Sequence, residues 1–185
     1  MKGVIFTEFL DLVEDKFGLE VQDAIIEKCD LPSGGSYTAV GTYDHSEIAT
    51  LVSKLSEKSG VPVPDLLQIY GEHLFGRFTV LYGRFFDGPM TAFEFLESVE
   101  SYIHVEVVKL YPTAQLPRFE TKRSSDDTLE MIYHSDRHLE DIAQGLIRGC
   151  LKHFGEDAEI HRDPATADGG VRFVITLLPG AAAAS

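Results

Sequence analysis

The hydrophobic positions in the first part of the chain recur every three to four residues, the spacing of an amphipathic helix. Residues 4–17 and 20–29 show this period, as do a stretch that begins at Asp44 and the longer segment 65–81. Gly18 follows the first stretch and is a common helix-ending residue. The pattern therefore predicts that the chain opens with four helices.

A further helical stretch covers residues 92–111, starting from a capping-box pattern at Thr91 and Glu94 and stopping before a proline. At about 100° per residue, His104 lies roughly 130° from the centre of the apolar stripe of this helix. Apolar residues also share the side of His104, so the helix is expected to pack on two partners. The main stripe is Ala92, Phe95, Leu96, Val99, Tyr102, Ile103, Val107 and Leu110.

Beyond residue 112 the hydrophobic period changes from 3.6 to 2, which is typical of strands. Residues 117–123 and 128–134 are predicted to form two strands and residues 139–154 a helix. Two more strands are predicted over 157–162 and 171–178. Helices followed by a ββαββ order favour an α+β fold with a small antiparallel sheet.

The length and composition indicate one soluble domain. The chain has 185 residues, 44% of them hydrophobic, which is enough for a single core. Its net charge of −14 disfavours nucleic acid and membrane surfaces as partners, and its two cysteines fit a reducing compartment. We expect a cytoplasmic domain over residues 1–180 and a disordered alanine-rich tail over 181–185.

Two groups of residues could bind a ligand. His104 is a strong ligand source among apolar neighbours, although a half-buried histidine beside a packing contact would look the same. In an extended strand, Tyr133, Ser135 and Arg137 would point to one side as a row of three donors. Such a row suits a ligand with two carboxylates, because arginine can hold one of them with two hydrogen bonds. An edge strand with an ordinary arginine salt bridge is the alternative.

Taken together, these residues resemble the haem-nitric oxide/oxygen binding (H-NOX) family, sensor domains related to the haem domain of soluble guanylate cyclase. The resemblance extends to about Pro179 and implies a helical distal subdomain over about 1–62 and a mixed proximal subdomain over about 63–180. The similar segments are His104 followed by Pro112, Tyr133-x-Ser-x-Arg137, Met1-Lys-Gly3, Tyr70-Gly-Glu72 and Gly145-Leu-Ile-x-Gly149.

The resemblance implies haem b as cofactor, with His104 as the proximal iron ligand. The row of three donors, Tyr133, Ser135 and Arg137, would then hold the two propionates. Val108 would face the porphyrin, and Pro112 would press on the macrocycle and keep it bent. No catalytic residue and no enzymatic activity are expected.

The residues that the resemblance places on the distal side are all apolar. Relatives that bind oxygen have a tyrosine at the position of Ile142, and a hydrogen bond to a charged or strongly polar group is worth about 1.5 to 3 kcal/mol. We therefore expect ferrous haem here to bind nitric oxide and CO while excluding oxygen. The distal residues are Ile5, Phe9, Leu74, Phe78, Ile142 and Leu146.

Nitric oxide is expected to break the bond between iron and His104, to let the haem flatten, and to shift the helical subdomain against the sheet. The signal would pass to a separate protein, a histidine kinase or a cyclic-di-GMP synthase or phosphodiesterase. Cys150 is the single cysteine in the last third of the chain, so no structural zinc is expected. The alternatives are a module that binds another dicarboxylate or fatty ligand, and an enzyme that uses His104 or His138 as a general base.

Overall fold

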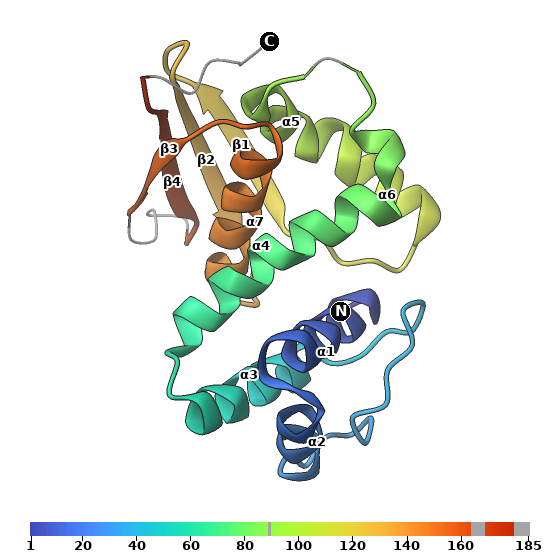
Figure 1. Ribbon diagram of the computed structural model, residues 1–185. Coiled ribbons are helices and arrows are strands. Elements are labelled where there is room, and N and C mark those ends of the chain that lie inside the picture. The colour runs from blue at the N-terminus through green and yellow to red at the C-terminus, as the bar shows by residue number, and fades with distance from the viewer. Residues whose placement is uncertain (89, 164–168, 180–185) are drawn as a thin grey trace.

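The computed structural model describes residues 1–88, 90–163 and 169–179, and its N-terminal part is helical (Figure 1). The predicted tail over 181–185 lies outside the described residues. Within the described ranges, no helix is both long and apolar enough to cross a membrane. The first helices are α1 (Val4–Phe17), α2 (Leu19–Glu27), α3 (His45–Ser59) and α4 (Val63–Leu81), as the hydrophobic period predicts.

Helix α3 shows how local chemistry sets the helix ends. Its N-cap Asp44 accepts a hydrogen bond from the Ser46 backbone N–H at 2.8 Å, and Gly60 ends it with a positive φ of 75°. Glu47 does not complete a capping box. Its buried carboxylate instead accepts hydrogen bonds from the hydroxyls of Ser33 and Tyr37, which holds the 31–43 loop against the helix.

Helix α4 crosses the middle of the molecule, between the N-terminal helices and the helix α7 (Glu140–His153) (Figure 1). The two helices touch along their backbones. A Cβ atom on Gly145 would lie 2.2 Å from the Gln68 carbonyl oxygen, and one on Gly71 would lie 2.3 Å from the Ile142 carbonyl oxygen. This contact requires glycine at both positions and brings the side chains of α7 close to those of α4.

The expected single helix over 92–111 is interrupted. It consists of α5 (Ala92–Ser98), a π-helical turn (Val99–Ile103) and α6 (His104–Leu110), and the His104 N–H bonds to the Val99 carbonyl five residues back. One extra residue in a turn rotates everything that follows by about 100°. The prediction of a continuous apolar stripe is therefore wrong, since Tyr102, one of its predicted members, is 49% exposed.

Four strands form an antiparallel sheet in the order β1-β2-β4-β3, which confirms the predicted α+β class. The second strand alternates as expected, with Leu129, Met131 and Tyr133 buried. Helix α7 lies between the sheet and α4 (Figure 1). The strands are β1 (Arg118–Arg123), β2 (Thr128–His134), β3 (Ala158–Asp163) and β4 (Val171–Leu177).

Two hydrophobic cores result, and α4 and α7 contribute to both. The first core lies among α1 to α4 and includes Tyr70 and Leu74 of α4 and Ile142 of α7. The second lies between the sheet, α5 and α7 and includes Phe75 of α4 and Ile147 of α7. The subdomain boundary near residue 62 stays a prediction.

Candidate functional site

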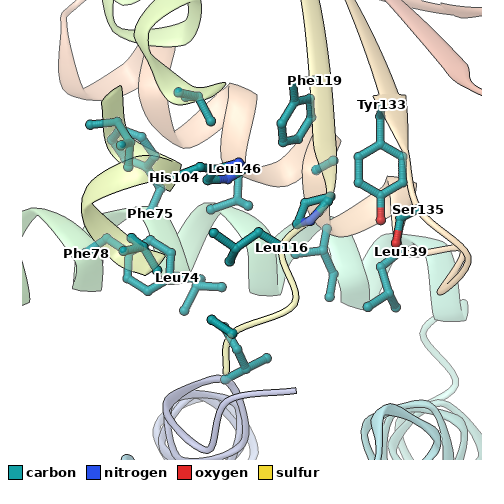
Figure 2. Close-up of a pocket in the computed structure, with 18 of the residues that line it drawn as sticks. Leu74, Phe75, Phe78, His104, Leu116, Phe119, Tyr133, Ser135, Leu139 and Leu146 are labelled. Carbon is teal, nitrogen blue, oxygen red and sulfur yellow. The ribbon is translucent and has the colours of Figure 1, made fainter. Parts of the chain in front are cut away.

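A cavity of about 290 Å³ lies where the two cores meet, a volume near the lower end of the range for small-ligand pockets. It is enclosed by α1, α4, the α5–α6 segment, β2, α7 and the loop that leads into β1 (Figure 2). Its lining is almost entirely apolar. A few polar side chains lie among the apolar ones, and their arrangement decides what the cavity can bind.

His104 lines this cavity, and its side chain is 16% exposed. Its Nδ1 lies 3.2 Å from Oε2 of Glu100, and the same oxygen accepts the backbone N–H of Phe119 at 3.0 Å. Burial lowers the pKa of His104, while the Glu100 carboxylate acts in the opposite direction. The carboxylate favours the tautomer with the hydrogen on Nδ1, in which Nε2 keeps its lone pair and can bind a metal.

Tyr133, Ser135 and Arg137 also line the cavity, but they do not form an extended row. Strand β2 ends at His134, and the chain then turns, with the Arg137 N–H bonded to the Ser135 hydroxyl at 3.2 Å. Figure 2 shows the Tyr133 hydroxyl directed toward Ser135. The strand thus ends where the sequence predicts, and the row that an extended strand would have given does not form. The turn gathers the three side chains at one edge, here called the donor edge.

The Arg137 guanidinium binds the loop that precedes β1. It donates to the Gln115 carbonyl oxygen at 2.7 Å and to its side-chain oxygen at 3.0 Å. A guanidinium has five N–H groups, so this contact leaves donors for a further anionic group. The donor edge therefore carries a permanent positive charge in a strongly acidic protein.

Five of the six expected distal residues line the cavity, and Phe9 does not. Phe9 is fully buried in the first core, where its ring packs against Tyr70 at 5.3 Å. Within the described part of the chain, the side chains that α1, α4 and α7 contribute to the lining are all apolar. The name apolar wall is used here for Ile5, Leu74, Phe78, Ile142 and Leu146.

Val108 and Pro112 lie outside the cavity. Val108 is 44% exposed, whereas its neighbour Val107 lines the cavity beside His104. Pro112 is exposed, whereas Pro117, in the loop before β1, lines the cavity. The lining therefore includes Val107 and Pro117 rather than Val108 and Pro112, and the cofactor contacts expected of the latter two stay predictions.

Sequence reasoning also missed Glu100 and a pair of tyrosines. The i, i+4 spacing of Glu100 and His104 was a signal that could have identified the first. The hydroxyls of Tyr82 and Tyr111, both on the lining, lie 3.5 Å apart, and the Lys2 amine sits 5.2 Å from the centre of the Tyr111 ring. Tyr82 directly follows α4 and Tyr111 directly follows α6, and neither belongs to the apolar wall.

One imidazole with a free Nε2, an apolar enclosure and three donors at one edge fit a flat apolar cofactor that has a metal and two carboxylates. The family described as haem-NO-binding matches residues 2–162. The chain belongs to this family. H-NOX domains bind haem and diatomic gases, and they act as gas-sensor modules.

Several solved structures that are similar to this chain are H-NOX proteins. The A71G mutant of the K. algicida H-NOX protein, in its ferrous unliganded form, is 44% identical, with a TM-score of 0.91 over 97% of this chain and 98% of that one. The Shewanella woodyi H-NOX, bound to IWP-051 in the Fe(II)CO state, is 42% identical, with a TM-score of 0.83 over 100% and 98% of the two chains. The soluble guanylate cyclase gcy-35 of Caenorhabditis elegans is 26% identical over 155 residues, and this match covers 80% of the chain but 22% of the cyclase.

Proposed function

We propose that this H-NOX chain is a haem b sensor that binds nitric oxide and CO at ferrous iron, excludes oxygen, and passes its state to a separate protein. The observation that best supports this proposal is that polar and apolar side chains line different parts of the cavity. His104 and the donor edge suit the cofactor, while the apolar wall offers no hydrogen-bond donor to a bound gas.

His104 and the residues of the donor edge each have a role in holding the cofactor. His104 ligates iron through Nε2, and Tyr133, Ser135 and Arg137 hold the propionates. Pro117 takes the role that the resemblance gave to Pro112, pressing on the macrocycle from the loop before β1. When bound, ferrous haem supplies a coordination position for a diatomic gas.

The apolar wall explains the proposed selectivity. Bound oxygen accumulates negative charge and gains about 1.5 to 3 kcal/mol from a hydrogen-bond donor, which corresponds to about ten- to a hundredfold in affinity. Nitric oxide binds ferrous iron without this help. The hydroxyls of Tyr82 and Tyr111, which also belong to the cavity lining, lie 3.5 Å from each other.

Release of His104 would free α6 and the loop that Arg137 holds, and α4 would carry the change to the N-terminal core. Such a change is a population shift between two packings of the same helices. We propose a histidine kinase or a cyclic-di-GMP synthase or phosphodiesterase as the partner and the cytoplasm as the location. The two free cysteines support the latter, because thiols stay reduced in that compartment.

Absorption spectra of the reduced protein after reconstitution with hemin test this proposal. We expect a Soret band that shifts with nitric oxide and with CO under argon and keeps its unliganded form in air. His104→Gly should lose the haem unless imidazole is added. His134→Ala is the matched control, because His134 is also 16% exposed but lies outside the cavity lining.

The outcomes separate the parts of the proposal. Wild-type protein that stays colourless after reconstitution would exclude haem and favour a module for another dicarboxylate or fatty ligand. A stable oxygen complex in air would exclude the proposed selectivity and leave the haem assignment intact.

A further inference from the structure

Glu100 lies four residues before His104, inside the π turn, and its side chain is 43% exposed. One oxygen of its carboxylate, Oε2, makes two contacts. It lies 3.2 Å from His104 Nδ1 and accepts the Phe119 backbone N–H at 3.0 Å. A single atom therefore joins the helix that carries the metal ligand to strand β1.

The hydrogen bond to Nδ1 has a chemical consequence for the opposite nitrogen. A carboxylate that accepts from Nδ1–H fixes the tautomer with the lone pair on Nε2, and it increases the electron density that Nε2 can donate to a metal. Since this partner is charged, its hydrogen bond is stronger than one to a neutral carbonyl. Partial exposure of Glu100 to solvent weakens the effect without removing it.

The hydrogen bond from the Phe119 backbone to Glu100 also fixes the position of the His104 imidazole relative to β1. The Phe119 ring packs 5.8 Å from the His104 ring and 5.5 Å from the Tyr133 ring, centre to centre. Both the backbone and the side chain of this β1 residue therefore hold the region around His104. A shift of the imidazole away from iron would change the contact of Glu100 with the sheet.

We infer that Glu100 is a positioning residue that sets the strength of the bond between His104 and iron, and that it does so while tied to β1 through Phe119. This inference rests on the proposed function, since it needs haem in the cavity. Loss of a residue that hydrogen-bonds a metal-ligating histidine typically lowers the affinity for the metal about ten- to a hundredfold. A weaker bond favours release of His104 when nitric oxide binds.

Two substitutions separate the charge of Glu100 from its role as a tether. Glu100→Gln keeps the length and one acceptor oxygen, so it should preserve the bond to Phe119 while removing the charge. Glu100→Ala removes both. The control is Glu97→Gln, because Glu97 also joins this helix to β1, through Arg123 at 2.7 and 3.2 Å, and makes no contact with His104.

The readouts are the iron–histidine stretching frequency of the ferrous protein, from resonance Raman spectra, and hydrogen exchange at the Phe119 amide. We expect both Glu100 variants to lower the frequency and to raise the five-coordinate fraction of the nitric oxide complex. Only Glu100→Ala should also speed exchange at Phe119. Glu97→Gln should keep the wild-type frequency.

A wild-type frequency in both Glu100 variants, in protein that binds haem and nitric oxide, would overturn this inference and leave the proposed function standing. A frequency lowered equally by Glu97→Gln would also overturn it, because any loosening of the helix would then suffice. Colourless wild-type protein would overturn the proposed function and this inference together.

Discussion

The two sides of the cavity are built in different ways. The apolar wall comes from α1, α4 and α7, whose side chains meet through direct helix packing. His104 and the donor edge come from a π turn and a sharp turn after β2, and hydrogen bonds to Glu100 and Gln115 hold them in place. The polar side sets the position of a cofactor, and the apolar wall sets the affinity of that cofactor for each small ligand. The two properties can therefore be changed separately.

The largest expected effect comes from placing a donor on the apolar wall. Ile142→Tyr adds a hydroxyl where the wall has none, so oxygen affinity should rise about ten- to a hundredfold. Gas titration of the ferrous protein measures it. Ile142→Phe adds similar bulk without the hydroxyl and should leave oxygen affinity low. Equal oxygen binding by both variants would show that space, not polarity, sets the selectivity.

A second change tests the packing behind the apolar wall. The new methyl group of Gly145→Ala would press on the Gln68 carbonyl of α4, so the free energy of unfolding should fall by about 1 to 3 kcal/mol. Urea denaturation measures it. Gly76→Ala, also in α4, is the control, because no neighbouring atom lies within 4 Å of its added Cβ. That variant should gain stability, by about 0.5 to 1 kcal/mol. An unchanged Gly145→Ala protein would mean that α4 and α7 can separate freely.

A third change acts on the donor edge alone. Tyr133→Phe removes one hydroxyl, and the haem should dissociate several-fold faster, equivalent to about 0.5 to 1.5 kcal/mol. Transfer of haem to an excess of an acceptor protein measures the rate. Oxygen affinity should stay unchanged. Tyr111→Phe removes a hydroxyl from another part of the lining and should retain haem as the wild type does; equal losses in both would contradict the assignment of the propionates to Tyr133.

The smallest expected effect is on the pH dependence of stability, and it comes from His73 of α4, which lies near the buried carboxylate of Glu8. Glu8 of α1 is paired with Arg77 at 2.6 Å and lies 3.7 Å from His73 Nε2. Burial lowers the pKa of His73 below 6.5, against the opposing effect of Glu8. The folded protein then binds fewer protons at His73 than the unfolded chain does, so stability is present above pH 6.5 and is lost as the pH falls through the lowered pKa.

His73→Gln should therefore lose less stability than the wild type between neutral and mildly acidic pH. Melting temperatures across this pH range, with the exposed His45→Gln as control, measure the difference. A wild-type pH dependence in His73→Gln would mean that the proton uptake occurs elsewhere.

The order of helices and strands could be predicted from the sequence because it depends on the period of the apolar residues. Residue type and spacing singled out His104 and the Tyr133 to Arg137 triplet, and the family resemblance assigned them to a cofactor; all four line the cavity. Such reasoning assumes a constant rotation per residue. The π turn over Val99–Ile103 breaks that assumption, which is why the apolar stripe predicted across residues 92–111 fails at Tyr102.

Other parts of the site depend on tertiary contacts that no local pattern records. The choice between Pro112 and Pro117 depends on the path of a loop held by Arg137, 22 residues away from Gln115. Phe9 is absent from the lining because its ring packs against Tyr70 of α4, a contact between residues far apart in the sequence. Glu100 required the position of β1, since half of its role comes from Phe119.

The membership of α4 in both cores has a consequence for how the domain comes apart. If the N-terminal helices detached, Tyr70 and Leu74 would face water on the same helix that supports Phe75 in the other core. Unfolding of either core would thus expose apolar side chains of the other core to water. Heating should therefore produce one cooperative transition rather than two successive ones.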